Sequence, residues 1–307
     1  MIKTENLTKK FEDYKALDTI NCTIPEGCIY GMVGSNGAGK STFLRLISGI
    51  YKADEGNVLI DEEDVYENPH VKSQIAFVPD ELFFLNGANM DRMAQFYRAC
   101  YPSFDEGRYK YLSDTFQLNT KKALTTFSKG MKRQAATILA ISCKPKYLFF
   151  DETFDGLDPV MRNLVKSLIC QDVEERKATA ILTSHSLREL EDTCDQLALL
   201  HKGGLVFESD ITNLKTKLFR VQVAFKEEYN KNTFEEIEML HFVKHGSVSN
   251  LIVRGERDEV VGKIRQMNPL LLEVLPLTLE EVFTYEMEAL GYAFSDVLMD
   301  REEADHE

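Results

Sequence analysis

Short apolar runs alternate with helix-like segments over about the first 215 residues of the chain. The predicted strands are 28–33, 75–78, 147–150 and 178–183, followed by a hairpin over 197–200 and 205–207. Within 41–47, Phe43, Leu44 and Ile47 recur at helical spacing, which predicts a helix directly after a glycine-rich turn. Strands that alternate with helices are typical of an α/β domain.

The pattern changes twice along the chain. From about 88 to 143 no strand-like run occurs and helix formers dominate, which predicts a helical insert. After Ser209, period-two alternation predicts a strand at 219–225. A second strand is expected at 250–254, with helices at 259–267 and 279–290. We therefore predict an α/β domain over 1–215 and a small α+β domain over 216–307.

The amino-acid composition predicts a packed core and shows an uneven distribution of charge along the chain. Of the 307 residues 44% are hydrophobic, enough for a packed core, and the net charge is −14. From Leu275 onward ten acidic residues face one base, Arg301, so this stretch alone carries −9. The last residues, from about Asp300, are expected to form a solvated end. An acidic chain is a poor candidate for binding nucleic acid or anionic lipid.

Other classes of protein are disfavoured by what the chain lacks. The first residues form no apolar core of a signal peptide, and no uncharged apolar run approaches the ~18 residues of a spanning helix. Six cysteines are scattered without a C-x-x-C pair. Such cysteines are typical of reduced thiols, so a cytoplasmic protein is expected.

The turn between the strand at 28–33 and the helix at 41–47 satisfies G-x-x-x-x-G-K-[ST]. Backbone N–H groups of such a loop surround phosphate oxygens, and the following helix adds the positive end of its dipole. Lys40 would reach the β- and γ-phosphates, and Ser41 would contact Mg²⁺. The residues assigned to the nucleotide here are Gly34, Ser35, Asn36, Gly37, Ala38, Gly39, Lys40, Ser41 and Thr42.

Two carboxylates end the apolar strand at 147–150. Asp151 is placed to hold the metal through water, and Glu152 to polarise an attacking water. A solvated strand end is the alternative, which the phosphate loop disfavours. These residues indicate a Mg-nucleotide hydrolase or kinase.

Further motifs narrow this class. Phe127-Ser128-Lys129-Gly130-Met131 precedes a helical run, Gly156-Leu157-Asp158-Pro159 follows Glu152, and His185 follows the strand at 178–183. In this order and spacing, over residues 1 to about 210, the set resembles the ATP-binding subunit of ABC transporters. The resemblance implies a P-loop NTPase core of the ABC type that binds ATP and Mg²⁺ and hydrolyses ATP.

The resemblance also implies roles for single residues. Two copies would dimerise head to tail, so that Ser128 and Gly130 cap the γ-phosphate of the ATP on the partner's Lys40, and Asp158 crosses the interface. Glu152 would be the catalytic base and His185 would contact the γ-phosphate. Phe11 matches the aromatic that stacks on adenine, with Tyr14 as the alternative.

Two segments depart from the family pattern. After Pro79 relatives usually have Gln, which contacts the metal and the membrane partner, whereas this chain has Asp80, a candidate for the same metal and communication role. In the signature segment, Lys129 and Met131 replace the usual Gly and Gln. Lys129 would either add positive charge near the phosphate or point to solvent.

The resemblance favours a subunit on the cytoplasmic face of the membrane that drives a separate permease, with export favoured over import. An ABC-type ATPase without a permease and a non-hydrolysing regulator are the alternatives. Phe83, Phe84 and Leu85, beyond Asp80, are expected either to contact the permease or to pack under the helical insert.

Overall fold

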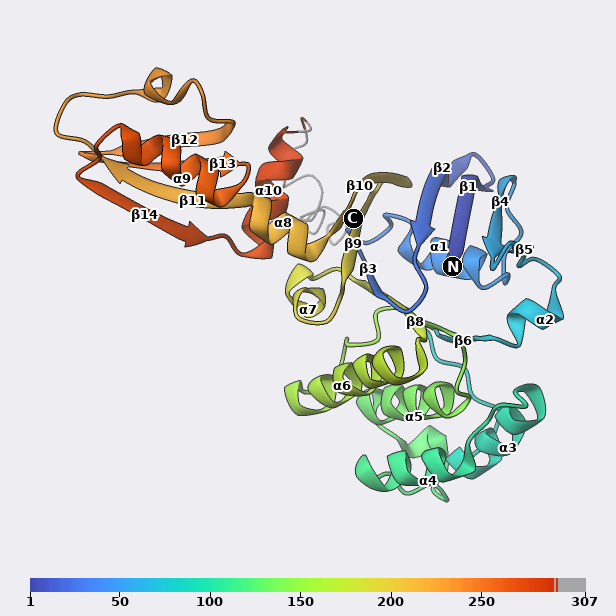
Figure 1. Ribbon diagram of the computed structural model, residues 1–307. Helices are drawn as coiled ribbons and strands as arrows, with labels where there is room; N and C mark the ends of the chain where they lie inside the picture. Colours follow the sequence, from blue (N-terminus) through green and yellow to red (C-terminus); the bar gives the residue numbers. More distant parts are fainter. Residues whose placement is uncertain (290, 292–307) are drawn as a thin grey trace, which may run out of the picture. The chain divides into compact units, whose positions relative to one another are not determined.

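The computed structural model describes residues 1–289 and 291 (Figure 1). The chain divides into two compact units, Met1–Glu208 and Ser209–Glu307, whereas the sequence placed this division after residue 215. The predicted solvated end from about Asp300 lies outside the described residues. No helix in the described part is long and apolar enough to cross a bilayer.

A six-stranded sheet, in the order β10-β9-β3-β8-β7-β6, forms the centre of the first unit. Its strands are β3 (Ile29–Val33), β6 (Ile75–Val78), β7 (Tyr147–Phe150), β8 (Thr179–Ser184), β9 (Gln196–His201) and β10 (Gly204–Asp210). The pairs β6–β7, β7–β8, β8–β3 and β3–β9 are parallel, so the carboxyl ends of these strands meet at one edge. The predicted α/β core is confirmed, and its sheet is mainly parallel.

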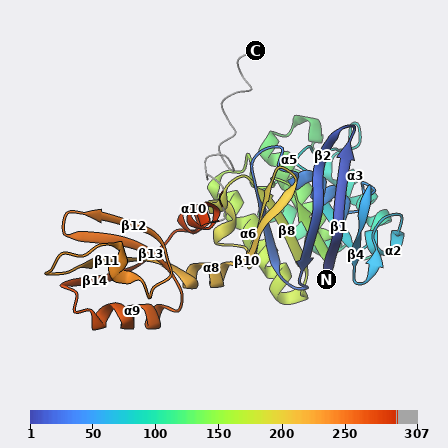
Figure 2. The same cartoon turned by 90° about the horizontal axis from the view of Figure 1, so that it is seen from above.

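A second, antiparallel sheet in the order β2-β1-β4-β5 lies beside the first, and the sequence analysis did not predict it (Figure 2). Its strands are β1 (Ile2–Phe11), β2 (Tyr14–Ile24), β4 (Glu55–Ile60) and β5 (Glu63–Asp64). The register of β1 against β2 shifts three times, between Thr4 and Leu7, between Leu7 and Lys9, and between Lys9 and Lys10. Such bulges break the period-two pattern by which a strand is found in a sequence.

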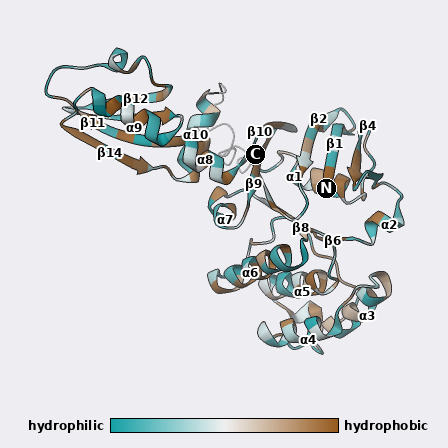
Figure 3. Ribbon diagram, in the orientation of Figure 1, coloured by the Kyte–Doolittle hydropathy of each residue, from teal (hydrophilic) through white to brown (hydrophobic). Residues whose placement is uncertain are grey.

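Helices complete the first unit. They are α1 (Lys40–Ile47), α2 (Pro69–Lys72), α3 (Met90–Cys100), α4 (Glu106–Thr115), α5 (Lys129–Ser142), α6 (Pro159–Arg176) and α7 (Leu187–Glu191), with a 3₁₀ turn at Leu124–Thr126. Helices α3 to α6 gather away from the antiparallel sheet (Figure 1), and hydrophilic and hydrophobic residues both occur along α6 (Figure 3). Phe43 and Leu44 of α1 share one core with Leu17 of β2 and Met32 of β3. This packing fixes α1, and with it Lys40 at its first position.

The second unit is a four-stranded antiparallel sheet with helices. Its elements are α8 (Ile211–Lys217), β11 (Leu218–Ala224), a 3₁₀ turn (Lys231–Phe234), β12 (Met239–His245), β13 (Val248–Arg254), α9 (Arg257–Gln266), β14 (Leu271–Pro276) and α10 (Leu279–Ala289). The strand order is β12-β13-β11-β14. Val260 and Ile264 of α9 pack against Val221 and Leu251 of the sheet. Helix and strands thus share one core, as in an α+β fold.

Candidate nucleotide site

The glycine-rich turn joins β3 to α1. Gly39, which precedes α1, has a φ of 108°, and a Cβ there would lie 2.6 Å from the Ala16 carbonyl oxygen. Only glycine fits this backbone without strain. Lys40 is 5% exposed, and its Nζ donates to the carbonyl oxygens of Gly34 (2.7 Å) and Ser35 (3.1 Å). The loop therefore holds a buried cation beside a helix N-terminus, an arrangement that binds anions.

Asp151 and Glu152 follow β7 at the carboxyl edge of the parallel sheet. Phe150 pairs with Leu182, so Thr183 at the end of β8 lies next to Asp151. The Thr183 hydroxyl donates to Asp151 Oδ1 (2.8 Å) and accepts from the Glu152 backbone N–H (3.1 Å). One hydroxyl thus positions both acidic residues. No role for Thr183 follows from the sequence alone, since its contact depends on the pairing of β7 with β8.

Asp151 is fully buried, and its Oδ2 has no hydrogen-bond partner among the described residues. Burial raises the pKa of this carboxyl, and the negative charges of Glu152 and Asp80 add to the effect, while the hydroxyls of Thr183 and Ser41 oppose it. A buried carboxylate oxygen without a partner fits a cation ligand.

Glu152 connects the phosphate loop to the histidine. Its backbone has a φ of 46°, in the left-handed region that costs a non-glycine residue about 1–3 kcal/mol and that is often found at functional sites. Its Oε1 lies 3.2 Å from Lys40 Nζ, and its Oε2 lies 3.2 Å from His185 Nδ1. The structure therefore brings Lys40, Glu152 and His185, which are far apart in the sequence, into one chain of contacts.

A cavity of 320 Å³ lies along the phosphate loop and includes Asp80 and Glu152 in its lining. Phe11 and Tyr14, at the end of β1 and the start of β2, also line it. Phe11 is 41% and Tyr14 57% exposed, and the Tyr14 hydroxyl donates to the Gly37 carbonyl (3.3 Å). Both aromatic candidates for the base therefore lie beside the phosphate site.

The signature segment lies at the start of α5. Ser128 caps this helix by accepting from the Met131 backbone N–H (3.2 Å), and its side chain is exposed. A Cβ on Gly130 would lie 2.9 Å from the Gly156 carbonyl oxygen, so the two segments approach closely only with glycine. Lys129 Nζ pairs with Asp155 Oδ2 at 2.9 Å.

Asp158 is also exposed and caps a helix. It accepts from the backbone N–H groups of Val160 and Met161, both at 3.0 Å, at the start of α6. Ser128, Gly130 and Asp158 do not line the phosphate cavity of their own chain. The start of α5, capped by the neutral Ser128, is thus exposed to an anion from outside, whereas the Asp158 carboxylate already accepts from the first N–H groups of α6.

Asp80 has a partner that the sequence analysis did not identify. Arg133 of α5, with a side chain 1% exposed, donates through Nη2 to Asp80 Oδ1 at 2.7 Å. Its Nη1 lies 3.4 Å from the carbonyl oxygens of Pro79 and Asp151. The candidate metal ligand Asp80 is therefore already the counter-ion of a buried guanidinium.

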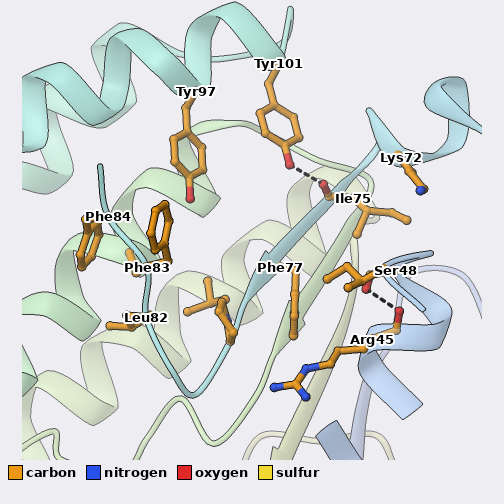
Figure 4. Close-up of a pocket in the computed structure, with 14 residues that line it drawn as sticks. Arg45, Ser48, Lys72, Ile75, Phe77, Leu82, Phe83, Phe84, Tyr97 and Tyr101 are labelled. Atoms are coloured by element: carbon orange, nitrogen blue, oxygen red, sulfur yellow. Dashed lines mark hydrogen bonds between the residues drawn. The ribbon is translucent and has the colours of Figure 1, made fainter. Parts of the chain in front are cut away.

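A second cavity, of 460 Å³, lies between the sheet and the helical insert (Figure 4). Leu82, Phe83 and Phe84 from the loop after β6 line it, and Phe83 is 79% exposed. Leu85 is not among its lining residues. The charged residues of the lining are Arg45 and Lys72, both basic.

The site combines a glycine-rich loop that holds a buried lysine with paired acids at the end of β7 in a parallel sheet. These features define a P-loop nucleoside triphosphatase. The family model described as ABC transporter matches residues 17–155. The ABC transporter ATP-binding protein YtrB of Bacillus subtilis (strain 168) is 31% identical over 284 residues, 92% of this chain and 97% of that protein. The chain therefore belongs to the ATP-binding subunits of ABC transporters, which bind and hydrolyse ATP to power a separate permease.

Other relatives match about 70% of the chain. The bacitracin transport ATP-binding protein BcrA of Bacillus licheniformis is 31% identical over 71% of this chain and 72% of that protein. A dimeric ATP-binding cassette solved in a post-hydrolysis state with ADP and Pi has a TM-score of 0.61 at 21% identity, covering 69% of this chain and 99% of that one. The predicted fold and ATPase class are confirmed.

Proposed function

We propose that the P-loop residues 34–42 bind the phosphates of ATP and that Phe11 stacks on the adenine. The observation that carries this proposal is the convergence of buried Lys40 with Glu152 and His185 at the carboxyl edge of the sheet. Both residues are exposed, and Phe11 is favoured over Tyr14 because the Tyr14 hydroxyl already donates to the loop.

Mg²⁺ fits Ser41 and Asp151. Asp151 offers a buried carboxylate oxygen without a partner, and Ser41 lines the phosphate cavity. No group of three or more His, Cys, Asp or Glu gathers for a metal in the described part of the chain. Mg²⁺ in such sites takes one or two protein oxygens and completes its shell with phosphate and water. When bound, the ion would neutralise charge on the phosphates.

Glu152 is proposed as the base that accepts a proton from the attacking water. Its Oε2 faces His185, which would contact the γ-phosphate and fix the position of the carboxylate relative to it. Asp80 shares the cavity, but its carboxylate accepts from Arg133. We therefore assign Asp80 to communication between the site and the loop that follows it, rather than to the metal.

Ser128, Gly130 and Asp158 are proposed to complete the ATP site of a second copy. Support comes from their place at two helix N-termini outside the phosphate cavity of their own chain, where Ser128 and Asp158 are exposed. The start of α5, with Ser128 and Gly130, would attract a phosphate brought by a partner, and Asp158 would reach across the interface. The chain would then act as a head-to-tail dimer that hydrolyses ATP only when both copies are in contact.

The permease is proposed to dock on the cytoplasmic face of the membrane, in the cavity lined by Leu82, Phe83 and Phe84. Phe83 is 79% exposed and lines one cavity with Leu82 and Phe84, and apolar side chains gathered at a surface mark interaction sites. The basic residues Arg45 and Lys72 favour a partner segment that carries both apolar side chains and a carboxylate. The resemblance to exporter-type subunits favours export of a compound from the cell, and BcrA is described as a bacitracin transport protein.

The site assignment is tested by phosphate release from the purified chain. Turnover should require Mg²⁺ and should disappear in Lys40→Ala, whereas Lys132→Ala, on α5, should behave as the native chain does. Turnover by Lys40→Ala would contradict the phosphate assignment.

The docking surface is tested by co-purification with the membrane protein of a neighbouring reading frame. Phe83→Asp/Phe84→Asp should abolish co-purification, while Tyr111→Asp, at a residue 67% exposed on α4, should not. Undiminished capture of the permease by the double variant would contradict this surface.

The direction of transport is tested in cells that lack the chain. Accumulation of a compound inside these cells would support export, and depletion of the compound would contradict export.

A further inference from the structure

The guanidinium of Arg133 joins three segments of the first unit. Arg133 lies in the second turn of α5, the helix that follows the signature segment, five residues after the exposed cap Ser128. One end donates to the Asp80 carboxylate, and the other lies against the carbonyl oxygens of Pro79 and Asp151. The loop after β6, the end of β7 and the signature helix therefore meet at one side chain.

The contact with Asp151 lies next to the reacting groups. Asp151 contributes its carbonyl to Arg133 and is followed by Glu152, the proposed base. Val78 pairs with Phe150, so the two strand ends that Arg133 contacts are neighbours in the sheet. A small shift of this backbone moves the Glu152 carboxylate, and misplacement by about 1 Å can reduce a rate about 10²-fold.

Asp80 makes this arrangement possible. A guanidinium stays protonated at any pH that the protein meets, so a buried one requires a counter-ion. Asp80 supplies it, with a side chain that is 55% exposed and thus partly in water. If the same carboxylate oxygen bound Mg²⁺, Arg133 would lose its counter-ion.

The pair also borders the proposed docking cavity. Pro79, whose carbonyl contacts Arg133, lines this cavity together with Ala136, which lies three residues after Arg133 on α5. A partner seated there would press on both sides of the pair.

We propose that Arg133 is a positioning residue for hydrolysis, and that its pairing with Asp80 transmits movement of the loop after β6 to Glu152 and to the signature helix. This inference rests on the proposed function of Glu152 as the base. It assigns to Asp80 no contact with Mg²⁺.

The experiment is a double-mutant cycle on the full chain, with Asp80→Asn, Arg133→Gln and both together. Each single variant should lower kcat about tenfold or more, while the Mg²⁺ half-saturation and the ATP dissociation constant stay within twofold. The double variant should be no slower than Arg133→Gln alone, because both substitutions break the same contact. Arg133→Lys, which keeps the charge, should recover part of kcat.

Arg98→Gln is the matched control, because Arg98 is half exposed and pairs with Glu106 in the helical insert. It should leave kcat unchanged. Multiplied effects in the double variant would overturn the inference, as would an Asp80→Asn variant that needs tenfold more Mg²⁺. If Arg133→Gln does not fold, the Mg²⁺ titration of Asp80→Asn and the kcat of Arg133→Lys still test the inference. Absence of turnover in the native chain, or turnover by Glu152→Gln, would instead contradict the proposed function.

Discussion

Substitution of Glu152 by Gln separates the proposed base from its other contacts. The amide has nearly the same shape, so Oε1 can still accept from Lys40, but it cannot take a proton from water. A positioned general base contributes roughly 10²–10⁴-fold to a rate. At about 1.4 kcal/mol per tenfold change, this corresponds to about 3–5 kcal/mol of the barrier.

The same substitution removes a charge from the phosphate site. At 3.2 Å and an effective dielectric constant of about 20, the attraction between Glu152 and Lys40 is about 5 kcal/mol before desolvation is counted. ATP must compete with this carboxylate for Lys40, so the variant should bind ATP at least as tightly as the native chain. We therefore expect kcat to fall by 100-fold or more while the dissociation constant for ATP stays equal or decreases.

Phosphate release measures kcat, a fluorescent ATP analogue measures binding, and size-exclusion chromatography with ATP should show a trapped dimer. Glu175→Gln, at an exposed acidic residue on α6, is the control and should match the native chain. Turnover of Glu152→Gln within threefold of native would refute the assignment of the base, and weakened ATP binding would refute the competition for Lys40.

Three other substitutions or labels test the surrounding structure. Burial opposes ionisation of Asp61, but hydrogen bonds from the terminal amine, a tyrosine hydroxyl and a lysine lower its pKa to about 2; Asp61→Asn should therefore lower Tm at pH 7, and the difference should vanish as the pH falls from about 4 to 2. Gly130→Ala should lower Tm by several degrees and slow ATP hydrolysis, because its Cβ would meet the Gly156 carbonyl at 2.9 Å, and an unchanged Tm would contradict this close approach. Alkylation at pH 8, followed by mass spectrometry, should label exposed Cys100 before Cys22, whose pKa burial raises to about 12, and equal labelling would contradict that burial.

Much of the nucleotide site could be predicted because its chemistry is local in the sequence. The phosphate loop lies in eight consecutive residues, and the strands at 75–78 and 147–150 have the predicted bounds. The contacts of Thr183 and Arg133 could not be predicted, because they depend on which strands are neighbours in the sheet.

The antiparallel sheet was missed for a different reason. Its first strand contains three register shifts against the second, so its buried residues do not alternate with exposed ones in a regular pattern. The boundary between the units was also placed too late, because β10 and α8 follow each other without glycine, proline or a change in charge that would mark a linker.

The exposed side chain of Phe83 has a consequence for the chain when it is alone. An apolar side chain beside a cavity favours association between copies, whereas a net charge of −14 makes copies repel one another. Salt shortens the range of this repulsion from about 10 Å at 0.1 M to about 3 Å at 1 M, but it leaves apolar attraction in place. The colloidal stability of the isolated subunit should therefore fall as salt rises, and Phe83→Asp should restore it.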